Sequence, residues 1–237
     1  MQHLGNSIEE IAAEKAGIFV CGKPAISAPQ VPAARRVLET EANEKRSPLE
    51  FVEEPLLGYP MALAGEHQAW NAALAVAALH RLGMPLSSDS VAYGLRNVSW
   101  PGRFEIIRPG VILDGAHNPQ SAQVLADTWK RGFPGKQASL VFSAVGGKDI
   151  AGVLEILAPL ASRIFLCPVD TPRAVSPAEL AGYLPAGAPP HETFGSFEKA
   201  FAAASSHEEP VLVAGSLFLV GEARALLTSG SFQPSSQ

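Results

Sequence analysis

Short apolar runs that alternate with helix-like stretches constrain the fold of this chain more than any other feature. Each run is only a few residues long and apolar throughout, which is typical of a strand covered on both faces. Strands that alternate with helices predict an α/β fold with a mostly parallel sheet. The runs occupy residues 111–113, 140–142, 164–166 and 211–213, and the helix-like stretches lie near 119–131, 150–160, 176–184, 196–206 and 217–228.

The first hundred residues have a different pattern, with much predicted helix and little strand. A turn signal at residues 100–104, with the sequence Trp-Pro-Gly-Arg-Phe, separates the two patterns. We therefore place a domain boundary between residues 101 and 102. The shortage of strands indicates part of an α/β domain rather than a whole one. The predicted helices are 7–16, 31–46, 66–82 and 87–96, with a short strand between Pro24 and Pro29 and an irregular or edge-strand segment over 47–65.

Composition excludes several classes of protein. The chain has 237 residues, of which 47% are hydrophobic and 17% charged, so it can form a core and is not intrinsically disordered. A net charge of −5 argues against broad nucleic-acid binding. No stretch approaches the roughly 20 apolar residues of a membrane span, so we expect a cytoplasmic protein without a membrane partner. Cys21 and Cys167 lie beside apolar runs without metal-ligand spacing, and we expect two buried free thiols.

A polar segment after the first apolar run is the sharpest candidate site. Residues 111–113 lead into Asp114, a glycine turn, His117, Asn118 and Pro119. Asn is a good N-cap and Pro a good first helical residue, so the segment is a strand–turn–helix junction. Open α/β sheets bind ligands at such strand ends, where Asp114 can accept from ribose hydroxyls and His117 lies where anions collect. The alternative is a structural turn in which both side chains make only local hydrogen bonds.

Three further positions are candidates, and each has a structural alternative. Ser216 follows a glycine at the end of the last apolar run, where it can bind a carboxylate or phosphate or act as an ordinary N-cap. Arg103, in the turn at the domain boundary, can clamp a phosphate or form a structural ion pair. Lys15 falls four residues after Ile11 on the apolar face of its predicted helix, where a lysine is unusual, with a snorkelling lysine as the alternative.

Motifs that the sequence lacks narrow the function further. No GxxxxGK[ST] and no GxGxxG pattern occurs, so the chain contains neither a P-loop nor a dinucleotide fingerprint. A hydrolase with Ser216 as nucleophile, His117 as base and Asp114 as orienting acid is disfavoured. Its GxSxG elbow is absent, and the three residues follow one another in the wrong order.

The motifs, in this order, resemble the folylpolyglutamate synthase/dihydrofolate synthase branch of the Mur ligases. The resemblance extends over nearly the whole chain, and its Glu-Lys-Ala-Gly-Ile and Asp-Gly-Ala-His-Asn-Pro elements are specific. The matching stretches are residues 4–8, 11–18, 23–25, 68–72, 100–104, 114–119, 148–149, 171–174 and 215–217.

The resemblance implies an ATP-dependent ligase of folate biosynthesis and one-carbon metabolism. In this family ATP phosphorylates a carboxylate of a folate or dihydropteroate-type substrate, and the amino group of L-glutamate attacks the acyl phosphate. ATP and Mg²⁺ are the implied cofactors. The implied architecture is a C-terminal part of the ATPase domain over residues 1–101, followed by a complete Rossmann-like C-terminal domain over residues 102–237.

The resemblance also implies roles for individual residues before the boundary. Lys15 matches a lysine that is carbamylated in this family and helps to hold a magnesium ion, since carbamylation turns a cation into a carboxylate. Gln68 and Asn71 match the helix that borders the nucleotide base.

Four residues after the boundary match further positions of the family's site. Arg103 matches a hinge arginine that reaches the ATP phosphates, and Asp114 an acid near the ribose and the interdomain linker. His117 matches a histidine near the terminal phosphate. Ser216 matches a serine near the glutamate end of the site. Lys15, His117 and Ser216 are therefore the expected catalytic residues.

The sequence departs from the family pattern in one respect. Family members carry an upstream segment with the P-loop, which is not found in this chain. We therefore expect the C-terminal part of a ligase, inactive alone, whose partner is an N-terminal segment of the same enzyme. The alternative is a non-catalytic module of Mur-ligase type that binds a nucleotide or a partner.

Overall fold

A computed structural model of the protein describes residues 7–228, and the chain divides into two compact units. The first unit comprises residues up to 62 together with 66–98, and the second comprises residues 63–65 and those from 99 onward. The start of the first matching stretch, residues 4–6, lies outside the described part. Each unit is described by itself.

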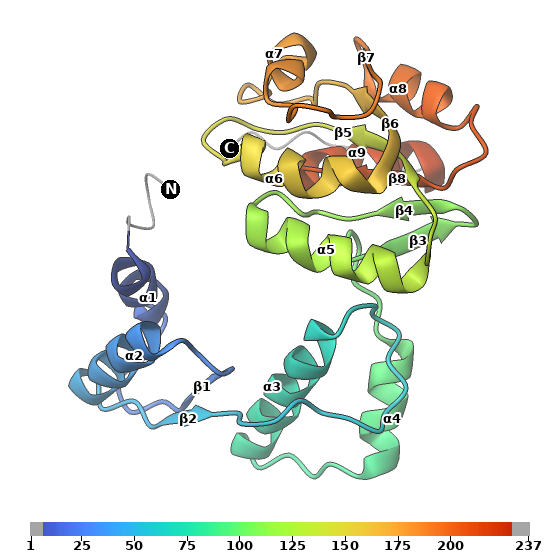
Figure 1. The fold of residues 1–237 in the computed structure, drawn as a ribbon. Coiled ribbons are helices and arrows are strands. Elements are labelled where there is room, and N and C mark those ends of the chain that lie inside the picture. Colours follow the sequence, from blue (N-terminus) through green and yellow to red (C-terminus); the bar gives the residue numbers. More distant parts are fainter. Residues whose placement is uncertain (1–6, 229–237) are drawn as a thin grey trace. The chain divides into compact units, whose positions relative to one another are not determined.

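The first unit contains helices and a two-stranded parallel sheet (Figure 1). Ser7 caps the first helix by accepting a hydrogen bond from the Glu10 backbone N–H at 3.1 Å. Ser87 and Ser90 form a reciprocal capping box at the fourth helix. The helices are α1 (Ile8–Ala16), α2 (Pro32–Glu44), α3 (His67–Arg81) and α4 (Ser88–Asn97), and the strands are β1 (Ala25–Ser27) and β2 (Leu49–Phe51).

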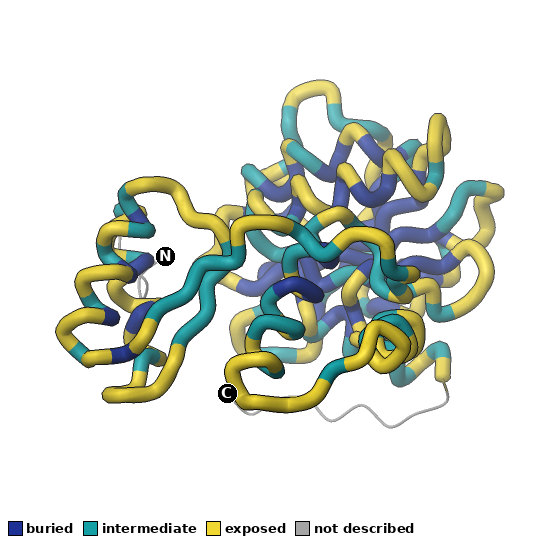
Figure 2. Tube along the Cα trace, turned by 90° about the horizontal axis from the view of Figure 1, so that it is seen from below, coloured by how far each residue is buried: buried dark blue, intermediate teal, exposed yellow. Residues whose placement is uncertain are grey.

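Small side chains make up most of the interior of the first unit. Among the described residues of this unit, the buried hydrophobic side chains are alanines and Leu38, and each alanine buries little apolar area. Figure 2 shows this part of the chain mainly in the colours of intermediate and exposed residues. The buried hydrophobic residues are Ala12, Ala16, Ala34, Leu38, Ala42, Ala69, Ala72 and Ala73.

The second unit is built on a six-stranded sheet with the order β3-β4-β8-β5-β6-β7. The edge strand β3 is antiparallel to β4, and all other neighbours are parallel. The parallel arrangement directs the carboxyl ends of β4, β8 and β5 toward one edge of the sheet. The strands are β3 (Glu105–Arg108), β4 (Val111–Leu113), β5 (Ala138–Phe142), β6 (Ala161–Leu166), β7 (His191–Thr193) and β8 (Val211–Ala214).

Helices cover both faces of this sheet. On one face pack α5 (Pro119–Gly132), α6 (Ile150–Leu157) with its short extension η1 (Ala158–Leu160), and α7 (Pro177–Gly182). On the other face pack α8 (Phe197–Ala204) and α9 (Leu217–Thr228).

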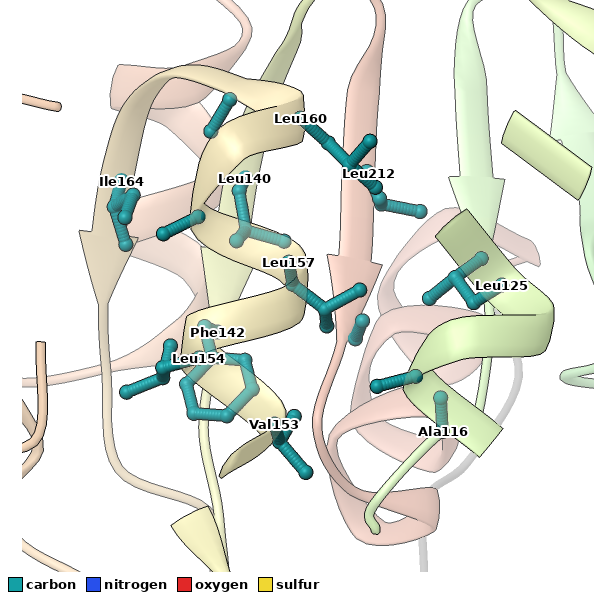
Figure 3. Close-up of a cluster of buried hydrophobic side chains, with 14 of the residues drawn as sticks. Ala116, Leu125, Leu140, Phe142, Val153, Leu154, Leu157, Leu160, Ile164 and Leu212 are labelled. Carbon is teal, nitrogen blue, oxygen red and sulfur yellow. The ribbon is translucent and has the colours of Figure 1, made fainter. Parts of the chain in front are cut away.

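Register explains why the strands are apolar throughout. Ile112, Leu212, Leu140 and Ile164 lie side by side across four strands and all face the α5–α6 side. Figure 3 shows Leu212, Leu140 and Ile164 on this side, together with Leu157 of α6. The next residue on each strand faces the α8–α9 side. Both faces are therefore buried, as a parallel sheet requires.

The structure confirms the predicted α/β class with its mostly parallel sheet, and it adds strands that the sequence pattern did not reveal. The two strands missed lie at the sheet edges. In β3 two adjacent isoleucines lie between charged residues, with Ile106 61% exposed, and all three residues of β7 are exposed. An edge strand lacks the continuous apolar run by which the central strands were found.

One thiol prediction is wrong. Cys167 is buried, and burial, with a smaller contribution from the charge of Glu222, raises its thiol pKa to about 12. Cys21 is exposed. The apolar residues before it form no strand, because the chain turns there through Gly22 with φ +69°. Among residues 7–228, no helix is both long and apolar enough to cross a membrane.

Candidate functional site

Asp114 ties the end of β4 to the turn at the start of the second unit. One carboxylate oxygen, Oδ2, accepts from the Phe104 backbone N–H at 2.8 Å, and the other, Oδ1, accepts from the Ala116 N–H at 2.8 Å. Burial raises the pKa of this carboxyl, while the two hydrogen bonds and the charges of Arg103 and His117 oppose the increase. The Asp114 side chain therefore connects two backbone segments through hydrogen bonds and also places a negative charge at this position.

Arg103 and His117 flank the Asp114 carboxylate, and both interact with it electrostatically. A Cβ atom at Gly115 would lie 3.4 Å from Nη1 of Arg103, so the guanidinium passes close to this backbone. The Nδ1 atom of His117 lies 2.8 Å from the Gly115 carbonyl oxygen. Because a carbonyl only accepts, Nδ1 carries the proton, and Nε2 is the ring nitrogen available to a ligand. The structure thus brings these predicted site residues together.

Helix α5 begins at Pro119 with Asn118 as its N-cap, as the sequence predicted. Asn118 Oδ1 accepts from the Ser121 N–H at 2.8 Å, and Pro119 occupies the first turn. The Ser121 hydroxyl accepts in return from the Asn118 N–H and from the His117 N–H. The first turn of α5 carries no acidic residue. Its N-terminus therefore offers positive potential beside His117.

Ser216 lies at the junction of β8 and α9. Its side chain is buried, and Oγ accepts from the Phe218 backbone N–H at 3.2 Å. The preceding Gly215 has φ +107°, and a Cβ there would lie 2.2 Å from the Ser143 carbonyl oxygen, so the close approach of the two strand ends requires glycine. Ser216 thus makes a local cap bond, and its role toward a substrate stays a prediction.

Gln68 and Asn71 lie one turn apart on α3 in the first unit. Gln68 is buried, and its Oε1 accepts from Asn71 Nδ2 at 3.0 Å. Asn71 is exposed. The pair forms a small amide cluster at the start of the helix, and its predicted contact with a nucleotide base stays a prediction.

Lys15 does not lie on a buried helix face, contrary to the prediction. The face of α1 that packs against α2 carries Ala12 and Ala16, while Ile11 is only half-buried and Lys15 is exposed. Successive helical positions differ by about 100°, so the step from Lys15 to Ala16 separates the exposed from the buried side.

The described part of the chain assembles no metal site of its own. No group of three or more His, Cys, Asp or Glu side chains is placed to hold a metal ion within residues 7–228. The exposed, unmodified Lys15 is itself a cation and would repel one. Residues 7–228 therefore do not fit Mg²⁺ by themselves.

Sequence reasoning missed two residues that contact the Arg103 turn. The Glu105 carboxylate accepts from the Gly102 N–H at 2.9 Å and forms an ion pair with Arg224 of α9. The spacing of Glu105 from Gly102 was the only available signal, because Arg224 is 119 residues away from its partner.

The second unit matches a known protein family. Residues 102–217 match the Mur ligase glutamate ligase domain. The second unit therefore carries a domain of the Mur ligase type. The curated relatives of the chain are folylpolyglutamate and dihydrofolate synthases, as the sequence motifs indicated.

Two curated relatives show the extent of the similarity. The Bacillus subtilis dihydrofolate synthase/folylpolyglutamate synthase is 35% identical over 203 residues, which cover 73% of this chain and 47% of the relative. The Escherichia coli enzyme of the same name is 31% identical over 92% of this chain and 55% of its own length. The chain thus spans about half the length of these relatives.

Solved structures agree with this assignment. The Mycobacterium tuberculosis folylpolyglutamate synthase complexed with ADP and AMPPCP matches with a TM-score of 0.87 and 28% identity, over 98% of this chain and 62% of that one. E. coli FolC in complex with DHPP and ADP matches with a TM-score of 0.81 and 29% identity, over 96% of this chain and 58% of that one.

Proposed function

We propose that this chain is the C-terminal part of an ATP-dependent, cytoplasmic ligase that joins L-glutamate to a folate or dihydropteroate-type substrate through an acyl phosphate. The observation that carries the proposal is the grouping of Arg103 and His117 around the Asp114 carboxylate at the end of β4. The relatives named folylpolyglutamate and dihydrofolate synthases support the same reaction.

The three grouped residues suit a phosphate-bearing ligand. Arg103 supplies a guanidinium that can donate two parallel hydrogen bonds to phosphate oxygens. His117 presents Nε2 at the N-terminus of α5, where negative charge is stabilised. Asp114 fixes the Arg103 turn and balances the positive charges before the ligand arrives. Ser216, at the neighbouring strand end, is the proposed contact to the glutamate end of the site.

The first unit contributes the proposed nucleotide-base helix and the proposed metal ligand. Gln68 and Asn71 offer amide donors and acceptors that can read the edge of a base. Lys15 lies exposed on α1 and accessible to CO₂. Its carbamylation would convert the cation that repels Mg²⁺ into a carboxylate that attracts it, and mass spectrometry at bicarbonate saturation would detect the added carboxyl group.

Calorimetric titration with ADP tests the phosphate site directly. Arg103→Met should weaken ADP binding by about tenfold or more, because one charge-assisted contact contributes roughly 1.5–3 kcal/mol. Lys130→Met is the matched control, since Lys130 is an exposed cation on α5 and its loss should leave the affinity unchanged. Equal ADP affinity of wild type and Arg103→Met would contradict the proposal.

The alternative is a non-catalytic binding module of Mur-ligase type, favoured by the absence of a P-loop motif from this sequence. Both interpretations predict that the chain alone shows no glutamate-dependent ATP turnover. Turnover would refute the binding module and the expected inactivity of the isolated chain, and it would leave the ligase reaction itself supported. Addition of a P-loop-bearing polypeptide of the same enzyme separates them. Restored turnover that is lost again in His117→Ala supports the ligase, and binding without turnover supports the module.

A further inference from the structure

The turn that carries Arg103 is strained and held from several sides. Gly102 has φ +70°, and Phe104 has φ +46°, which is costly for a residue with a side chain. The Gly102 carbonyl accepts from the Gly115 N–H at 2.9 Å, and the Phe104 N–H donates to Asp114. Such a conformation persists only where surrounding contacts enforce it.

One face of α9 supplies those surrounding contacts. Leu217, Val220 and Arg224 are separated by three and four positions, so they share one side of the helix. A Cβ at Gly115 would lie 2.3 Å from Leu217 Cδ2, and a Cβ at Gly102 would lie 2.9 Å from Val220 Cγ1. The helix therefore packs directly against both glycine backbones that border the site.

The third contact of this face is the Arg224–Glu105 ion pair. One Glu105 oxygen accepts from the Gly102 N–H at 2.9 Å and the other pairs with Arg224. Both side chains are only partly exposed. Arg224 thus orients the carboxylate that fixes the first residue of the strained turn.

Helix α9 begins at Leu217, directly after Ser216. The same rigid helix therefore starts at one predicted ligand-binding residue and braces the turn that presents another. We infer that the α9 face formed by Leu217, Val220 and Arg224 is a positioning device for Arg103, in which Arg224 acts through Glu105 without touching the ligand. The inference rests on the proposed function, because it assigns Arg103 to phosphate binding.

Hydrogen exchange tests the positioning without any ligand. In Arg224→Met the backbone amides of Gly102 and Phe104 should exchange at least about tenfold faster than in wild type. The Gly102 amide loses the oriented Glu105 carboxylate as its acceptor, and the Phe104 amide, which donates to Asp114, opens with the turn. Lys130→Met, which removes one cation from the exposed face of α5, should leave both amides protected. Arg224→Lys keeps the charge and should recover part of the protection. Unchanged protection in Arg224→Met would overturn the inference.

A double-mutant cycle on ADP affinity separates positioning from a general structural role. Arg224→Met should weaken ADP binding about tenfold in the wild-type background and have no further effect in Arg103→Met, because the two residues act through one contact. Additive losses would overturn the inference. If wild type binds no ADP, the proposed phosphate site fails, and the exchange of Gly102 and Phe104 still decides whether α9 holds the turn.

Discussion

At the scale of single residues, partly buried carboxylates fix the local geometry of the second unit. Asp114 bridges Phe104 and Ala116 through backbone N–H groups, and Glu222 accepts from the Asp170 N–H at 2.7 Å. An ionised acceptor makes stronger hydrogen bonds than a neutral one, but it loses hydration when it is buried. For each carboxylate, the hydrogen bond stabilises the folded state, whereas the loss of hydration of the charge destabilises it. Because both contributions depend on ionisation, the contribution of the carboxylate to stability depends on pH.

Glu222 provides a test of this pH dependence. Burial raises its pKa, the Asp170 N–H opposes the increase, and the Asp170 charge adds to it. Because the pKa in the folded state lies above the ordinary value of 4.5, the folded state binds more protons than the unfolded state near that pH. The free energy of unfolding therefore falls as pH rises from 4.5 through the raised value.

Glu222→Gln removes the ionisation and keeps an oxygen that can accept from Asp170. We expect it to be more stable than wild type at pH 7 by less than about 1 kcal/mol, since solvent screens this half-buried group. The gain should disappear below about pH 4.5, where both side chains are neutral. Urea unfolding across pH measures the difference, with the exposed Glu155→Gln on α6 as control. A gain that persists at pH 4 would contradict the assignment.

At the scale of elements, the decisive feature of the second unit is the close approach of the β8–α9 junction to the end of β5. Gly215 combines φ +107° with a Cβ position 2.2 Å from the Ser143 carbonyl oxygen and 2.5 Å from the Phe142 ring. Neither the backbone of β5 nor the buried Phe142 can move away without disturbing the centre of the sheet. The junction therefore tolerates no side chain.

Gly215→Ala should lower the free energy of unfolding by about 2–4 kcal/mol, because backbone strain and overlap with β5 add together. Gly195→Ala is the matched control, since a Cβ at Gly195 meets nothing within 4 Å and its backbone is not left-handed. The control should change stability by less than about 0.5 kcal/mol. Urea unfolding followed by tryptophan fluorescence measures both, and equal effects would contradict the assignment of Gly215.

Sequence pattern predicted the elements whose cause is local. The runs around Ile112, Leu140, Ile164 and Leu212 are apolar because both faces of each strand are covered, and that property is visible in any window of the sequence. The Asp114 junction was found for the same reason, since its cap and its turn are consecutive. The contact of Glu105 with Arg224 could not be found, because only the fold brings the two together.

Lys15 shows the opposite error. The local spacing of apolar residues suggested that it is buried, but burial is decided by the packing between helices. The spacing from Ile11 placed it on an apolar face, whereas the small side chains of Ala12 and Ala16 allow α1 to approach α2 on the adjacent side. Helical periodicity identifies faces only to within about one residue when the apolar residues are few.

At the scale of the whole molecule, the two units differ in how they are stabilised. The second unit buries Leu, Val and Phe on both sides of its sheet and Ile and Trp on one side, whereas the described part of the first unit buries mainly alanines. The first unit also exposes large apolar side chains, including Ile18 at 80% and Leu82 at 72%. Both line a groove of about 570 Å³ beside β1 and α3. Such an apolar surface favours self-association.

Leu82→Ser and Leu57→Ser test whether that groove is the surface through which copies of the chain associate. The two leucines are almost equally exposed, at 72% and 73%, but only Leu82 lines the groove. We expect the wild-type chain to bind anilinonaphthalene sulfonate and to associate with increasing concentration, and Leu82→Ser to reduce both by about twofold or more. Leu57→Ser should change neither. Dye fluorescence and sedimentation velocity measure the two effects, and equal reductions in both variants would show that exposed area in general, rather than the groove, drives association.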